Sequence, residues 1–172
     1  MQETGENMRI RPYIEDKDYP YLEKWIDNER AHAMWCGNYI PYPMTKENLH
    51  RTLRENERDW TDSAYVATED DGMPAGFFCY CIDVSNNTGF LKYVIVDNTK
   101  RGRGYGERML RLALQYAFTI TGAQVVQLNV FPENLPAKRC YEKAGFKVRQ
   151  ITKGVFSYRD ELWDRCNMAA AK

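Results

Sequence analysis

Three glycines stand within five residues at the junction of a predicted strand and a predicted helix. The apolar run 94–96 leads through Asp97 into Arg101-Gly102-Arg103-Gly104-Tyr105-Gly106, where a helical pattern begins. The amide N–H groups and the dipole of a helix start both favour an anion. Glycines let that anion approach the backbone, and the two arginines add charged donors. The segment therefore predicts a binding site for phosphate groups.

Two common phosphate-binding motifs do not account for this segment. The chain has no Gly-x-x-x-x-Gly-Lys-Ser/Thr sequence, and Glu107 stands where a dinucleotide fingerprint has its last glycine. The Arg-Gly tract is also too short to indicate nucleic-acid binding. Considered alone, the segment has one further interpretation, which is a tight strand-to-helix turn with incidental arginines.

A second cluster lies downstream, between residues 134 and 146. Asn134 is a good helix cap, and Pro136 suits the first turn of the helix that follows. Tyr141 lies two turns after Asn134 on the same face, and Gly145 ends the helix. Considered alone, Tyr141 would be interpreted as an aromatic residue of the core.

Together the two clusters resemble the signatures of the GNAT superfamily of acyl-CoA-dependent N-acetyltransferases. The family's Arg/Gln-x-x-Gly-x-Gly/Ala signature matches Arg101-x-x-Gly104-x-Gly106. Its later motif is matched at Asn134, Ala137, Tyr141 and Gly145-Phe146. The order of predicted elements over residues 8–169 also fits, so the resemblance covers nearly the whole chain.

The resemblance implies an enzyme that moves an acetyl group from acetyl-CoA, its co-substrate, to a primary amine by direct attack in a ternary complex, with no metal. It implies that the backbone of Ile95 and Val96 pairs with the pantetheine arm and that the amides of Arg101–Gly106 hold the pyrophosphate. Asn134 would contact the pantetheine, and Tyr141 would protonate the departing thiolate. The alternative is a catalytically inactive CoA-binding sensor or interaction module of the same fold.

The general base is less well defined by the sequence. Many members of the family carry a Glu on the strand before the glycine loop, whereas residues 90–96 contain only Lys92 as a charged side chain. Asp83 or Asp97, acting through a water relay, are the candidates. The alternative is that both are ordinary solvated carboxylates. The missing Glu favours the inactive module, and the retained Tyr141 favours the enzyme.

The amine acceptor is expected to meet two regions that combine aromatic rings with acids, a combination that suits a cationic amine. Covering the core is the alternative role for these rings. The resemblance leaves a polyamine or other small cationic amine, an amino sugar, or a peptide N-terminus as acceptor. The residues concerned are Glu29, His32, Trp35, Tyr39 and Tyr42 in the first region, and Phe156, Tyr158, Asp160, Glu161 and Trp163 in the second.

Alternation and helical periodicity predict an α/β fold. Strands are expected at 8–12, 63–68, 75–82, 90–96, 125–130, 146–152 and 162–169, and helices at 18–26, 45–57, 105–120 and 135–144, with a loop over 32–42. The resemblance implies one mixed, mostly antiparallel sheet of about six to seven strands with a parallel pair at its centre, flanked by about four helices. Residues 1–7 are expected to be extended or disordered, and residues 8–172 to form one acetyltransferase domain.

Composition limits the remaining classes. The chain has 172 residues and no apolar run long enough for a membrane helix or a signal peptide. We therefore expect a cytoplasmic protein without membrane or nucleic-acid partners. A homodimer is compatible with the family. Five cysteines without a Cys-x-x-Cys pair favour neither a disulfide framework nor a zinc site.

The net charge of zero conceals a division along the chain. Residues 1–96 carry 10 basic and 17 acidic side chains, and residues 97–172 carry 14 basic and 7 acidic ones. The basic half suits the phosphates of CoA, and the acidic half suits an ammonium group.

Overall fold

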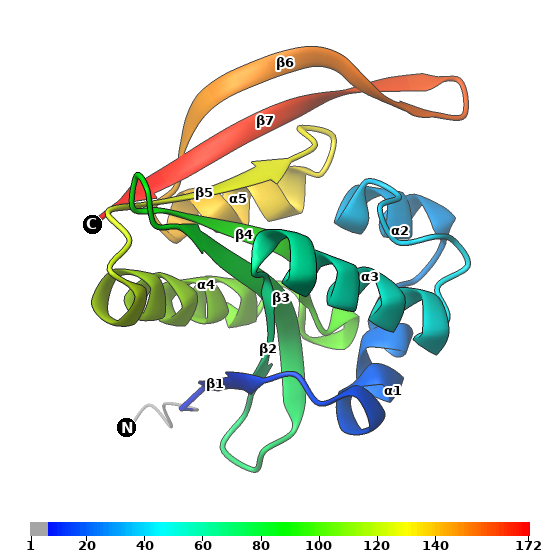
Figure 1. Ribbon diagram of the computed structural model, residues 1–172. Coiled ribbons are helices and arrows are strands. Elements are labelled where there is room, and N and C mark those ends of the chain that lie inside the picture. Colours follow the sequence, from blue (N-terminus) through cyan, green and yellow to red (C-terminus); the bar gives the residue numbers. More distant parts are fainter. Residues whose placement is uncertain (1–6) are drawn as a thin grey trace.

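A seven-stranded mixed sheet forms the centre of the molecule (Figure 1). The computed structural model describes residues 7–172, so the expectation for the N-terminal segment lies almost entirely outside the described residues. The strands are arranged in the order β1-β2-β3-β4-β5-β7-β6, and β4 and β5 form the parallel pair at the centre. They are β1 (Arg9–Pro12), β2 (Ser63–Thr68), β3 (Pro74–Asp83), β4 (Thr88–Val96), β5 (Val125–Val130), β6 (Lys147–Tyr158) and β7 (Glu161–Ala171). The predicted fold class is confirmed.

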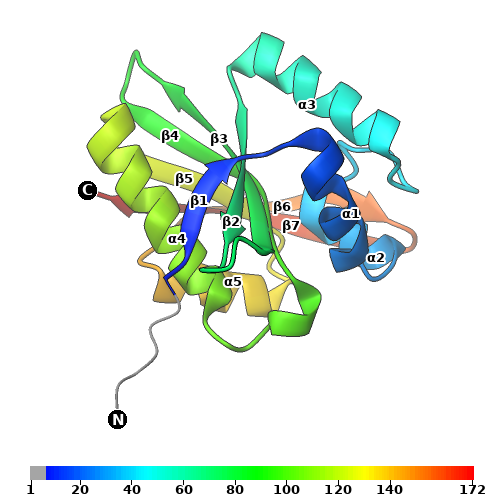
Figure 2. The ribbon, with the colours of Figure 1, turned by 90° about the horizontal axis from the view of Figure 1, so that it is seen from below.

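Helices cover both faces of this sheet (Figure 2). They are α1 (Glu15–Trp25), α2 (Glu29–Cys36), α3 (Lys46–Trp60), α4 (Tyr105–Tyr116) and α5 (Leu135–Lys143). Successive side chains of a strand point to opposite faces. Accordingly, Phe77 and Cys79 pack in the apolar cluster beneath α1, α2 and α3, whereas Phe78 and Tyr80 pack in the cluster beneath α4 and α5. No helix within residues 7–172 is long and apolar enough to cross a membrane.

Helix α2 replaces a predicted loop, so the structure has five α-helices where about four were expected. The loop expected over 32–42 is wrong for its first half, because α2 extends from Glu29 to Cys36. Asn28 caps the helix by accepting a hydrogen bond from the amide of Ala31 at 2.9 Å, and Gly37 ends it in the left-handed conformation. These two end signals were present in the sequence.

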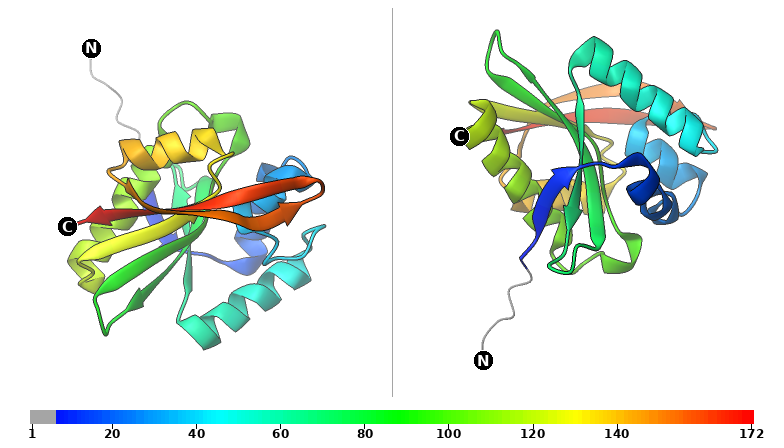
Figure 3. Two further views of the ribbon diagram at one scale, coloured as in Figure 1. Left: turned by 90° about the horizontal axis from the view of Figure 1, so that it is seen from above. Right: turned by 60° about the horizontal axis from the view of Figure 1, so that its bottom comes forward.

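The β6–β7 hairpin is longer than predicted and reaches toward α2 (Figure 3). Residues 153–161, expected between the last two strands, lie mostly within β6 and β7, and Tyr158 lies opposite Glu161 beside the turn. Ala33 of α2 packs against Tyr158 and Trp163 of the hairpin in a separate apolar cluster. This contact supports the hairpin far from the main core.

A β-bulge in β4 separates it from β5. The register of β3 against β4 shifts between Phe77, which lies opposite Ile95, and Cys79, which lies opposite Lys92. Tyr93 within the bulge has a φ of +52°, an unusual conformation for an aromatic residue. In the described chain β4 pairs with β5 over Thr88–Phe90, and the two strands diverge beyond that point (Figure 1).

Candidate functional site

A cavity of about 600 Å³ extends from the gap between β4 and β5 to the glycine loop before α4. It is lined by the second half of β4, the end of β5, the loop and the inner side of α5. Nine of the ten predicted site residues line it, namely Ile95, Val96, Arg101, Gly102, Gly104, Tyr105, Gly106, Asn134 and Tyr141. The topology therefore brings the two sequence clusters to one cavity.

The β5-facing edge of β4 is available along this cavity. On its other edge, Ile95 and Val96 pair with β3, but within the described chain no strand pairs with the β5-facing edge beyond Phe90. Trp35 of α2 donates its indole N–H to the carbonyl of Tyr93 at 2.9 Å, which satisfies one group at the bulge. An exposed strand edge of this kind can accept an extended ligand as an additional strand.

Two glycines of the loop adopt the left-handed backbone conformation that favours glycine. Gly102 and Gly104 have φ values of +75° and +80°, and a Cβ atom on either would meet no atom within 4 Å. The first helical hydrogen bond of α4 joins the amide of Arg108 to the carbonyl of Gly104. The amides of Gly106 and Glu107 lie in this first turn and have no intrahelical acceptor. The space above the loop is open to a ligand.

Positive charge predominates around the loop. Lys100, Arg101, Arg139 and Lys143 line the cavity together with one carboxylate, that of Glu107. That carboxylate accepts hydrogen bonds from Arg111 at 2.8 and 3.1 Å. Sequence reasoning did not single out Lys100 or Lys143 as part of the site.

Arg103 is the predicted residue that the structure does not place along the cavity. Its guanidinium lies 5.5 Å from the centre of the Tyr105 ring. Tyr105 is the first residue of α4, directly after the loop, and it is almost fully buried. Arg103 therefore lies against the ring of Tyr105 and does not line the cavity.

Glu69 supports the loop from below, a role that sequence reasoning missed. Its carboxylate accepts hydrogen bonds from the ammonium group of Lys100 and, at 2.7 Å, from the hydroxyl of Tyr105. These two donors hold the pKa of Glu69 below its usual value. The contact joins the β2–β3 turn to a loop 31 residues further along the chain, and no local pattern indicates it.

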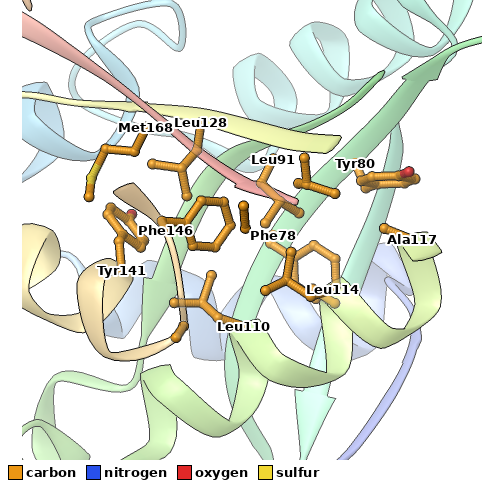
Figure 4. Close-up of a cluster of buried hydrophobic side chains, with 14 of the residues drawn as sticks. Phe78, Tyr80, Leu91, Leu110, Leu114, Ala117, Leu128, Tyr141, Phe146 and Met168 are labelled. Carbon is orange, nitrogen blue, oxygen red and sulfur yellow. The ribbon is translucent and has the colours of Figure 1, made fainter. Parts of the chain in front are cut away.

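Helix α5 presents Asn134 and Tyr141 to the cavity. The side-chain oxygen of Asn134 caps the helix by accepting from the amide of Ala137, so its NH₂ group is the part with donors to offer a ligand. Tyr141 packs beside Phe146, at a ring distance of 6.1 Å (Figure 4). Burial raises the pKa of Tyr141 well above its usual value, and its hydroxyl makes no hydrogen bond within the described chain. It is a protonated donor at neutral pH.

The two carboxylates named as candidate bases lie away from Tyr141. Asp97 caps a short turn by accepting from the amide of Thr99 at 2.9 Å and from its hydroxyl at 2.8 Å. Asp83 lies at the opposite end of the β3–β4 hairpin, where it accepts hydrogen bonds from Ser85. Neither residue lines the cavity.

A second cavity of about 490 Å³ adjoins the first on the side of α3 and the β6–β7 hairpin. Both cavities are lined by residues of α2, β4 and β5, so they meet at the gap between the strands. Trp35, Tyr39 and Phe156, from the predicted aromatic set, line this second cavity. Its volume and position suit a small acceptor that approaches from the side opposite the glycine loop.

The predicted acids lie outside this second cavity. Glu29 accepts from Arg159 at 2.9 Å, and Glu161 accepts from Arg30 at 3.0 Å. Among the predicted rings, His32, Tyr158 and Trp163 are buried, and Tyr42 is exposed beside His32. The ion pairs of Glu29 and Glu161 join α2 to the hairpin, so these two carboxylates are not free to bind a ligand.

Comparison with known proteins identifies relatives that are described as N-acetyltransferases. The model of the acetyltransferase (GNAT) family matches residues 29–146. The SPbeta prophage-derived uncharacterized N-acetyltransferase YokL of Bacillus subtilis (strain 168) is 30% identical, over 90% of this chain and 84% of its own. The spermidine N(1)-acetyltransferase of Escherichia coli (strain K12) is 25% identical, over 84% and 75%. A crystal structure of spermidine N-acetyltransferase from Vibrio cholerae, in complex with CoA and spermine, superposes with a TM-score of 0.79 at 19% identity, covering 95% of each chain.

The Glu69 contact predicts a pH-dependent contribution to stability. A carboxylate whose pKa is lowered by folding stabilises the fold above its unfolded pKa, and this contribution is lost as the pH falls through the folded pKa. Glu69→Gln should therefore lower the free energy of unfolding more at pH 6 than at pH 3, as measured by urea denaturation. Asp70→Asn, which removes a carboxylate of the same turn that contacts neither Lys100 nor Tyr105, is the reference. An equal effect of Glu69→Gln at both pH values would contradict the support role.

Proposed function

The chain belongs to the GNAT family of N-acetyltransferases, and we propose that it transfers the acetyl group of acetyl-CoA to a primary amine by direct attack within a ternary complex. One observation carries the proposal. Tyr141 is almost fully buried, its hydroxyl makes no hydrogen bond within residues 7–172, and it lines the same cavity as the glycine loop and the open edge of β4. A phosphate site, a strand edge and a proton donor are thus combined in one place.

The proposed cofactor position follows the lining of the first cavity. The pyrophosphate lies on the loop amides of residues 101–106, where Arg139 and Lys143 add positive charge. The pantetheine arm extends along the β4 edge, where it pairs with the backbone of Ile95 and Val96. Asn134 contacts the arm from α5. This arrangement directs the thioester toward Tyr141 and the gap between β4 and β5.

The proposed reaction needs no covalent enzyme intermediate. The neutral amine nitrogen attacks the thioester carbonyl carbon, and a tetrahedral oxyanion forms near a backbone N–H of the Val96 region. When the oxyanion collapses, the carbon–sulfur bond breaks and the sulfur takes the proton of the Tyr141 hydroxyl. The nitrogen loses its extra proton to solvent, and solvent reprotonates Tyr141. The juxtaposition of amine and thioester supplies much of the rate acceleration.

The relatives named above include spermidine acetyltransferases, and the acceptor of this chain is likewise proposed to be a primary amine. A small amine that enters as an ammonium ion and a peptide N-terminus both satisfy the chemistry. Either must lose a proton before it attacks. In this chain Asp83 and Asp97 lie away from the cavities, so we propose that solvent in the second cavity accepts that proton.

Tyr141→Phe tests the general acid. The variant should lower turnover by about 10²–10⁴-fold with little change in CoA affinity, because it removes a proton donor and leaves the ring in place. Release of free CoA thiol in the presence of an amine panel measures turnover, and calorimetry measures affinity. Tyr80→Phe is the matched control, since this buried hydroxyl of the same apolar cluster bonds to Thr121 at 2.7 Å. Unchanged turnover in Tyr141→Phe would contradict the assignment. Tight CoA binding with no thiol release from any amine would indicate an inactive CoA-binding module.

Gly104→Val tests the phosphate site. The new side chain meets no protein atom near its Cβ and occupies the space of the pyrophosphate, so CoA affinity should fall by about 100-fold or more. Gly122→Val is the matched control, because Gly122 has a φ of +79°, has similar open space, and follows the helical turn Ala117–Thr121 that continues α4 away from the loop. Both variants should show a similar loss of thermal stability. Retained CoA affinity in folded Gly104→Val would contradict the loop assignment.

A further inference from the structure

The charges of the second cavity bear on the chemistry of the acceptor. Among residues 7–172, the charged side chains that line this cavity are Lys92 and Arg165, and no carboxylate lines it. Two acids of the neighbouring helix and hairpin, Glu29 and Glu161, pair with arginines outside the cavity. Whatever enters this cavity therefore meets positive charge.

The two cations are not equivalent. The ammonium group of Lys92 lies 3.0 and 3.1 Å from the carboxylate oxygens of Asp62, which is almost fully buried behind it. Most of the Lys92 charge is thus compensated within the protein. Arg165, on β7 opposite Thr152 of β6, is exposed and makes no ion pair within the described chain. Among the lining residues that the structure describes, the Arg165 guanidinium is therefore the charge without a compensating carboxylate.

Apolar surface accompanies this charge. Tyr39 and Trp60 line the cavity with 78% and 66% of their surfaces exposed, and Trp35 and Phe156 contribute further ring surface. Exposed aromatic rings of this kind offer a contact for an apolar or ring-shaped portion of a ligand. The cavity thus combines an aromatic rim with the guanidinium of Arg165.

From this combination we infer that the acceptor is a primary amine that also carries an anionic group, a carboxylate or a phosphate, and that Arg165 binds this anion. The inference rests on the proposed function and specifies its acceptor. A planar guanidinium forms paired hydrogen bonds with either kind of anion. A polyamine would bring additional ammonium groups against Arg165, and no carboxylate among the lining residues that the structure describes could receive them, which is unfavourable.

Matched amine pairs test the inference. Thiol release is measured with tyrosine and tyramine, with phenylalanine and phenethylamine, and with glucosamine 6-phosphate and glucosamine, and spermidine is added as the polyamine. In at least one pair the anionic member should have a kcat/KM about 10-fold or more higher than its neutral partner. The amino-acid pairs report a carboxylate ligand, and the sugar pair reports a phosphate ligand. Preference for spermidine, or no advantage of the anionic member in any pair, would overturn the inference.

Charge reversal at Arg165 separates this inference from the proposed function. Arg165→Glu should abolish or invert the preference for the anionic member, whereas Arg165→Lys should retain part of it, and CoA affinity should be unchanged in both. Arg149→Glu is the matched control, because Arg149 lies on β6 of the same hairpin, bonds to Asn167 at 2.8 Å and does not line the cavity. An unchanged preference in folded Arg165→Glu would overturn the role of Arg165. Absence of thiol release with every amine would instead count against the proposed acetyl transfer.

Discussion

The β-bulge at Tyr93 is the constraint on which the site depends. The pairing of β4 with β5 covers three residue pairs and stops before the bulge, and no described strand pairs with this edge in the second half of β4. An ordinary parallel pair would satisfy those backbone groups and close both cavities. Trp35 and Asn56 hold the bulge by bonding to the carbonyl and the hydroxyl of Tyr93. The interruption is therefore built into the packing of α2 and α3 against the sheet.

The remaining functional groups are positioned around this gap by rigid elements. Helix α4 directs its first turn toward the cavity, and Glu69 fixes the preceding loop through Lys100 and Tyr105. Helix α5 places Tyr141 in the same cavity from the other side. The basic half of the chain supplies the charges near the loop. The acidic half is used largely in ion pairs and caps, so the division of charge along the chain does not mark an acidic acceptor surface.

Local patterns predicted the elements and the first cavity well. The bounds of β2 and β5 agree with the predicted ranges, and the glycine loop and Tyr141 line one cavity, as the family resemblance implied. Three features escaped prediction because they depend on contacts between distant segments. The left-handed Tyr93 requires support from two helices, Glu69 reaches the loop from another hairpin, and Arg165 lines a cavity formed by six different segments of the chain.

The central claim is that the interrupted pairing of β4 provides the docking edge for the cofactor. Amide hydrogen exchange of residues 91–107, with and without CoA, tests this claim most directly. The account predicts that CoA slows exchange both in the glycine loop and at the β4 edge around Ile95 and Val96, because new backbone hydrogen bonds form there. Protection of the loop without any change along β4, or tight binding with no protection in either segment, would contradict it.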